Sequence, residues 1–303
     1  MKKISTILII FICLISVADF SLAKMGIKKP IIIPPEMQKV ESHFELETYL
    51  EHPDSQIREA AVIRLGQIGG SDAITVLLKF FENEPETKGV IDVPYGVKEA
   101  VVVALRQIGG EEVKEQILKL LSDTLKFGPI ANAYKEKRYT GQASHIIYLS
   151  LEALSDFQDD NVIRILEEIA KDQISPRNSF IAQTARRSLV KITLKKQGIT
   201  RTEDRVNYLV NMLTGSGSGP GTFIRDGLNP RKTEEALKNG AIEDVLKNLG
   251  LEAGALPYLE KSLTRASEST ERGKAIKNVI KRIKQISKGR ARTGKAIVIP
   301  SKK

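Results

Sequence analysis

The chain has 303 residues, of which 41% are hydrophobic and 28% are charged. This composition is typical of a globular protein and excludes an intrinsically disordered chain. Aromatic residues make up only 5% and tryptophan is absent, so aliphatic and small side chains must fill the core. The formal net charge is +10, but from Arg272 to the end there are 12 basic residues and no acidic one. The basic character therefore belongs to one end of the chain.

The first 23 residues are predicted to be a secretory signal peptide. Lys2 and Lys3 precede an apolar run over residues 4–17, and Ser21-Leu22-Ala23 supplies small residues before a cleavage site. The run is shorter than the roughly 20 residues of a membrane-spanning helix, although an uncleaved anchor is the alternative. The only cysteine, Cys13, lies inside this run, so cleavage leaves no thiol for a disulfide, a metal site or a nucleophile. We therefore expect an exported bacterial protein, periplasmic or secreted.

A repeat follows a Pro-rich segment, residues 24–37, that is predicted to be an extended lead-in. REAAVIRLGQIGG at residues 58–70 is nearly repeated as KEAVVVALRQIGG at residues 98–110. In the first copy Ile57, Ala61, Leu65 and Ile68 lie on one stripe of a helix. Lys238 interrupts this stripe in the fifth of six copies. The third residue of the stripe is, copy by copy, Leu65, Leu105, Leu151, Leu189, Leu246 and Ile283.

Each copy is preceded by a second helical pattern, which predicts six helix pairs. Pro53 ends the first of these helices, and Asp54 or Ser55 can cap the helix that follows. Gly69-Gly70 and Gly109-Gly110 permit a left-handed exit from a helix and a tight turn. The first helices of the six pairs are expected at about residues 40–52, 71–84, 111–122, 159–171, 202–213 and 252–264.

A helix, a Pro-Asp turn and Arg-Glu-Ala-Ala followed by Leu-Gly-x-Ile-Gly resemble the HEAT repeat of armadillo-type solenoids. The resemblance is clear over residues 38–198, repeats 1–4, and looser over residues 199–287, repeats 5–6. It implies an all-α fold, an α-solenoid of about six helix pairs. In such repeats a basic residue early in the second helix bonds neighbouring turns, and Arg58 and Lys98 match that position. Ser144 and Ala182 occupy it in later copies, so the resemblance does not imply an unbroken ladder.

Four insertions interrupt the repeats between first and second helices, at residues 85–94, 123–142, 172–178 and 214–232. In a solenoid such junctions share one edge, which often forms a binding surface. The alternative is that they are tolerated surface loops. Tyrosine and arginine are enriched at interface hot spots, and the segment at residues 214–232 opens with a flexible Gly/Ser run. The candidate partner-binding residues are Tyr134, Lys135, Lys137, Arg138, Tyr139, Phe223 and Arg225.

The basic end is predicted to be a last helix over residues 272–287 and a disordered tail over residues 288–303. Its charge fits a solvated cap, an acidic protein partner, an anionic membrane surface or, least well, nucleic acid. No aromatic residue occurs from Arg272 onward, so base stacking has no support. The candidate residues for an anionic surface are Lys281, Arg282, Lys284, Lys288, Arg290 and Arg292.

No motif in the sequence indicates catalysis, a cofactor or a metal. A P-loop-like segment, residues 289–295, has Ala296 where Mg²⁺ binding needs Ser or Thr. His43 and His52 lie about 180° apart on a helix. Asp156, Asp159 and Asp160 lack the spacing of a calcium loop and are expected to cap a helix. The Gly/Ser run at residues 215–219 has no central nucleophile.

We therefore predict a non-catalytic protein-interaction scaffold with an unidentified protein partner and no cofactor. One alternative is a peripheral membrane or polyanion-binding protein that uses the basic end. Another is an enzyme, since some HEAT-like proteins are lyases that attach bilin pigments. A pocket that unites His145 with carboxylates would favour the enzyme. The sequence does not indicate an oligomeric state.

Overall fold

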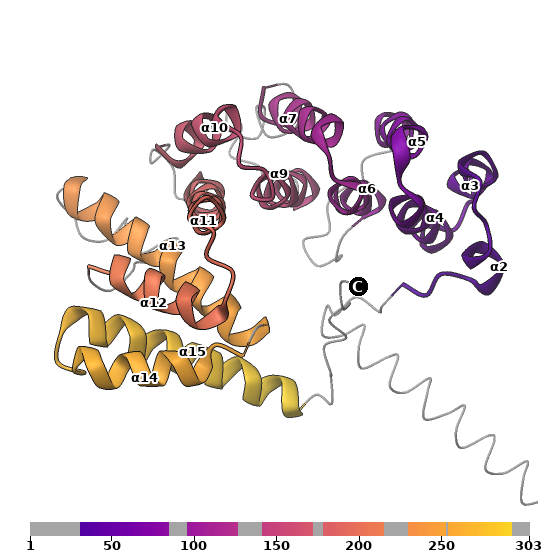
Figure 1. The fold of residues 1–303 in the computed structure, drawn as a ribbon. Coiled ribbons are helices and arrows are strands. Elements are labelled where there is room, and N and C mark those ends of the chain that lie inside the picture. The colour runs from indigo at the N-terminus through magenta and orange to yellow at the C-terminus, as the bar shows by residue number, and fades with distance from the viewer. Residues whose placement is uncertain are drawn as a thin grey trace, which may run out of the picture. The chain divides into compact units, whose positions relative to one another are not determined.

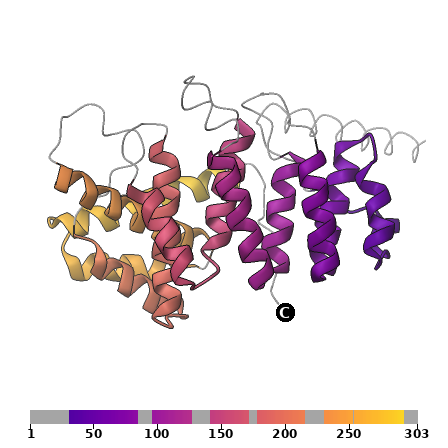
Figure 2. The same ribbon diagram turned by 90° about the horizontal axis from the view of Figure 1, so that it is seen from above.

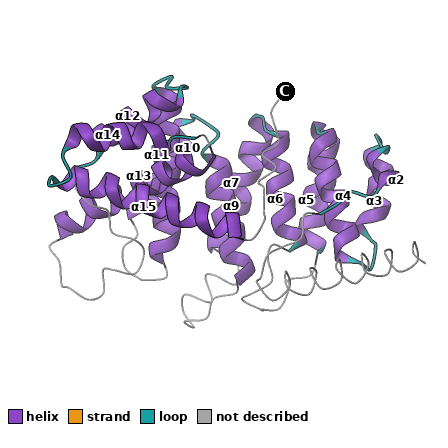
Figure 3. Cartoon of the chain, turned by 90° about the horizontal axis from the view of Figure 1, so that it is seen from below, coloured by secondary structure: helices purple, strands orange, loops and turns teal. Residues whose placement is uncertain are grey.

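The computed structural model describes residues 31–84, 96–126, 141–171, 178–214, 230–252 and 254–292. These residues form thirteen helices and no strand (Figures 1 and 3). The predicted all-α class is confirmed, and the arrangement agrees with a solenoid of helical repeats. None of the helices in these ranges combines the length and the apolar character that a membrane crossing requires.

After the short helix α2 (Pro35–Gln38), the helices follow one another in six pairs at the places that the repeat predicts. Leu65, Leu105, Leu151, Leu246 and Ile283 are all buried, as their positions on the apolar stripe require. The pairs are α3 (His43–Leu50) with α4 (Ser55–Ile68), α5 (Gly70–Asn83) with α6 (Val97–Ile108), α7 (Glu111–Lys126) with α9 (Gly141–Leu154), α10 (Asp160–Lys171) with α11 (Asn178–Lys196), α12 (Thr202–Met212) with α13 (Pro230–Glu252), and α14 (Leu256–Ala266) with α15 (Glu271–Arg292).

The helix ends follow local side-chain chemistry. Asp54 caps α4, because its carboxylate accepts a hydrogen bond from the amide of Gln56 at 2.8 Å. Asp159 caps α10 in the same way, accepting from the amides of Asn161 and Val162. Between α4 and α5, Gly69 and Gly70 have φ angles of 73° and 85°, which side chains with a Cβ rarely adopt.

Several helix ends differ from the sequence prediction. The lead-in, expected to be extended through residue 37, contains the helical turn α2, where Pro35 occupies a first-turn position that suits proline. The insertion predicted over residues 214–232 ends earlier than expected, because α13 begins at Pro230, where proline again occupies the first helical position. At the basic end α15 continues through Arg292 into the predicted disordered tail. Cationic side chains in a last turn are favourable to the helix dipole.

The chain divides into two compact units, and the first comprises residues 1–153. In this unit α4 packs against α6, and α3 packs against α5, so that α4, α6 and α9 form one row and α3, α5 and α7 the other (Figure 1). Figure 2 shows these helices, indigo to magenta, standing side by side. Helices α4 and α6 approach closely at Gly66, where an added Cβ would lie 2.8 Å from the Cβ of Ala104.

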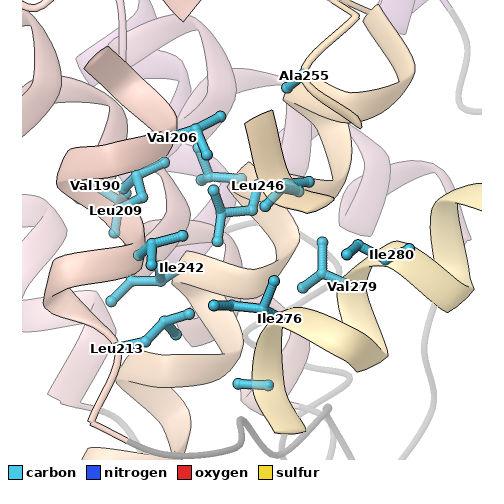
Figure 4. Close-up of a cluster of buried hydrophobic side chains, with 14 of the residues drawn as sticks. Val190, Val206, Leu209, Leu213, Ile242, Leu246, Ala255, Ile276, Val279 and Ile280 are labelled. Carbon is cyan, nitrogen blue, oxygen red and sulfur yellow. The ribbon is translucent and has the colours of Figure 1, made fainter. Parts of the chain in front are cut away.

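The second unit comprises residues 154–303. Helices α11, α13 and α15 contact one another in sequence, and α12 contacts α14. They enclose an aliphatic core in which Leu209, Ile242 and Val279 are completely buried (Figure 4). The core contains no aromatic side chain among its fully buried members. The divergent fifth and sixth repeats therefore pack as helix pairs despite their weaker sequence pattern.

Candidate functional site

The candidate partner-binding residues of the insertions lie outside the described residues. These are Tyr134, Lys135, Lys137, Arg138, Tyr139, Phe223 and Arg225. The hypothesis that these insertions form a binding edge stays a prediction.

The basic helix α15 uses part of its predicted cationic surface for internal ion pairs. Arg282 lies 3.4 Å from Asp244 and 3.7 Å from Glu243, both on α13. Lys284 lies 2.7 Å from Glu260 on α14. Among the described residues Lys281 and Lys288 are exposed and form no ion pair, whereas Arg290 and Arg292 lie at the end of α15. The structure therefore separates two cations that stabilise the last repeat from two that face solvent.

Arg58 joins two neighbouring repeats, as the resemblance implies for this position. Its guanidinium donates to the carbonyls of His52 and Pro53 at 2.8 and 3.0 Å, at the turn that leads into α4. It also pairs with Glu84, which caps the end of α5, at 2.8 Å. Lys98, in the next repeat, lies over the ring of Phe81 at 5.0 Å.

Asn239 takes the place of Arg58 in the fifth repeat, which the sequence analysis missed. It is buried, and its side-chain oxygen accepts hydrogen bonds from the amide and hydroxyl of Thr214 at 3.3 Å. Thr214 follows the end of α12, just as His52 and Pro53 follow the end of α3. The role was recognisable only by aligning the position, because an amide replaces the guanidinium.

His145 lies beside one carboxylate. Its Nδ1 is 3.8 Å from the carboxylate of Glu99, whose side chain is 3% exposed, while the histidine side chain is 41% exposed. The two residues hold neighbouring positions on α6 and α9 and connect these helices. No cluster of three or more potential metal ligands exists in the part of the chain that the structure describes. The contact is a pair between neighbouring repeats.

The other histidines and aspartates that the sequence analysis considered form structural contacts. His43 bonds the carbonyl of Gly69 at 2.9 Å, and His52 accepts from the amide of Asp54. Asp156 and Asp160 pair with Lys195 and Lys196 of α11.

An aliphatic position faces away from the paired helices in the first unit. Ile63, Val103 and Leu149 each follow a buried stripe residue by two positions, which is 200° around the helix. Val103 is 47% exposed, and its counterparts on α4 and α9 are half-buried. We call these three residues the aliphatic stripe. Val103 is the exposed member of this row, and it is the position at which contact with a protein partner is tested below.

A small cleft lies between α3 and α5, on the other row of the first unit. Its volume is about 210 Å³, and Glu47, Glu51, Glu84 and Lys79 supply its charges. A hydrogen bond from Lys79 to Glu47 at 2.8 Å raises the pKa of this lysine above its ordinary value. The cleft is acidic on balance but too small for more than one side chain of a partner.

Comparison with known proteins agrees with the repeat architecture. Residues 57–83 match the family model described as PBS lyase HEAT-like repeat. The matched segment is α4 followed by α5, so the family unit begins with the helix that contains REAAVIRLGQIGG. The chain matches no curated protein and no solved structure in these comparisons.

Proposed function

Since this chain is a HEAT-repeat protein, we propose that it is a non-catalytic scaffold for protein–protein interaction in the bacterial periplasm or cell envelope. Helical repeats that contact only their neighbours leave long surfaces available for recognition. The observation that carries the proposal is the aliphatic stripe on α4, α6 and α9, with Val103 47% exposed. Export is supported by the signal-like first 23 residues alone.

The name of the family model mentions a lyase, but a repeat fold does not determine an activity. A non-catalytic role is supported by the use of the charged side chains in caps and inter-repeat contacts. Arg58 and Glu99 both serve neighbouring helices. The lyase alternative would instead require a reacting group that binds a substrate.

Site-specific crosslinking in the native compartment tests the scaffold function. A photoreactive residue at Val103 is expected to yield a discrete protein adduct, and the same residue at Ser71, exposed on α5, is the matched control. Val103→Glu should abolish binding of the partner, because a charge on an apolar contact surface is costly to desolvate. Equal adducts at both positions, or none at Val103, would refute the proposal. Sequencing of the mature N-terminus should find Lys24 first, and an uncleaved cytoplasmic chain would refute export.

The two exposed lysines of α15, Lys281 and Lys288, support a second candidate function, which is binding to an anionic membrane surface. Each basic residue near such a surface contributes about 1 kcal/mol. Lys281→Glu with Lys288→Glu should abolish sedimentation with vesicles of mixed phosphatidylcholine and phosphatidylserine at low salt, because the serine lipid makes the surface negative. Arg282→Gln, which removes an ion-paired charge, should change sedimentation less. Sedimentation that is unaffected by the double substitution would refute this candidate.

A further inference from the structure

The fifth repeat breaks the apolar stripe at one position, and a cavity lies at that position. The first residue of the stripe is Ile57, Val97, Ala143, Ile181 and Ala275 in the other five repeats, but Lys238 in the fifth. Lys238 is exposed on α13 and lines a groove of about 720 Å³ within the second unit. This volume falls in the range of about 300–1,000 Å³ that is typical of ligand sites. Lys238 therefore lies at the edge of a space next to the core.

The floor of the groove is apolar. Val190 and Ala241 are buried members of the aliphatic core of this unit, and Met212 packs against that core. Figure 4 shows Val190 at the margin of the core, beside Leu209. Leu189 of α11 is half-buried in the same groove. An apolar side chain that enters the groove would extend the core.

The rim of the groove is cationic. Lys171 ends α10, Lys238 lies on α13, and Arg186 donates to the carbonyl of Ala170. Glu167 is the one acidic residue of the lining. Lys171 and Lys238 are exposed and form no ion pair with any other described residue. Their charges remain available to a ligand.

We propose that the groove between α10, α11, α12 and α13 binds an acidic segment of the protein partner, in which an aliphatic side chain is flanked by aspartate or glutamate. The aliphatic side chain would occupy the floor at Val190, and the flanking carboxylates would pair with Lys171 and Lys238. The charge of the rim argues for an acidic partner, because like charges across an interface are unfavourable. The rim residues are exposed and the floor residues are buried, so a side chain of a peptide can enter the groove from solvent and reach the core. This inference rests on the proposed scaffold function.

Binding of labelled peptides to the full chain tests the inference. The probe is a fluorescein-labelled heptapeptide with two central leucines flanked by aspartate and glutamate. Its control is the same peptide with asparagine and glutamine in place of the acids. Anisotropy should show at least about tenfold tighter binding of the acidic peptide at low salt, and the difference should shrink as salt screens the charges. Equal binding of the two peptides, or no binding of the acidic one, would overturn the proposal.

Lys238→Ile is the decisive variant, because it restores the residue type of the other repeats and should leave the fold intact. It should weaken binding of the acidic peptide by about fivefold or more, since it removes one of the two charges that would pair with the carboxylates. Lys281→Ile makes the same change on α15, away from the groove, and should bind as the unmodified chain does. Equal weakening by both variants would mean a general charge effect and would overturn the proposal.

Two further outcomes separate this inference from the scaffold function. Retained crosslinking at Val103 with no peptide binding would overturn the groove and leave the scaffold in place. Peptide binding without any adduct at Val103 would refute the scaffold as proposed while supporting the groove. Displacement of the acidic peptide by decanoate at equal concentration would assign the groove to a small amphiphilic anion and overturn the peptide.

Discussion

Gly66→Ala should destabilise the first unit, although alanine normally stabilises a helix. In an unobstructed helix this substitution gains about 1 kcal/mol from helix propensity. Here the new Cβ would lie 2.8 Å from the Cβ and 2.9 Å from the Cα of Ala104 on α6. Backbone atoms of a packed helix cannot rotate away, and overpacking of this kind costs about 1–3 kcal/mol. The net effect expected on the free energy of unfolding is a loss of about 1 kcal/mol.

Urea unfolding followed by circular dichroism measures this change, and hydrogen exchange in α4 and α6 localises it. A double-mutant cycle with Ala104→Gly supplies the control. Ala104→Gly alone should cost about 1 kcal/mol in helix propensity. Combined with Gly66→Ala, it removes one of the two colliding Cβ atoms, so the double variant should be more stable than the sum of the singles by about 1 kcal/mol. Stabilisation by Gly66→Ala, or simple additivity in the cycle, would refute the close approach of the two helices.

Three further predictions test the contacts of individual side chains. Arg58→Lys should lower the free energy of unfolding by about 1–3 kcal/mol in urea titrations, because one ammonium cannot replace three guanidinium contacts. The control is Lys98→Arg at the equivalent position of the next repeat, which should leave the free energy of unfolding nearly unchanged. Asn239→Ala should cost about 1–2 kcal/mol in the melting of the second unit, and an unchanged melt would contradict its role. Glu47 raises the pKa of Lys79 in the folded protein. The contribution of this ion pair to the free energy of unfolding is therefore complete below the pKa of lysine in the unfolded chain, and it is lost as the pH rises through the pKa of the folded protein. Titration by NMR should give Lys79 a pKa above the ordinary value for lysine, and Glu47→Gln should lower that pKa.

The helix pairs were predictable because burial imposes a period on the sequence. Leu65 and Leu105 must face the core of their own repeats, so their spacing repeats with the structure. Helix ends were less predictable. Pro230 can begin a helix or interrupt a loop, and only the packing of α13 decides between these roles. The apolar stripe of the repeat does not indicate where a helix begins or ends.

The contacts between repeats were harder to predict than the repeats themselves. Asn239 does the work of Arg58 with a different functional group, so no residue pattern connects them. The pairing of His145 with Glu99 depends on how far neighbouring helices are displaced along their axes, which a single sequence does not specify. Lys238 departs from the apolar stripe of the repeat, but the groove beside it depends on how four consecutive helices pack, which the stripe does not specify.

The contacts of Arg58 also bear on how an array of this kind can change length. Its guanidinium holds the carbonyls that immediately precede α4 and the carboxylate that immediately follows α5. The two ends of the α4–α5 segment therefore meet at one side chain. A segment whose entry and exit coincide can be duplicated or excised in the gene with little displacement of the chain on either side. The same guanidinium that stabilises a junction thus makes the segment a natural unit of gain and loss.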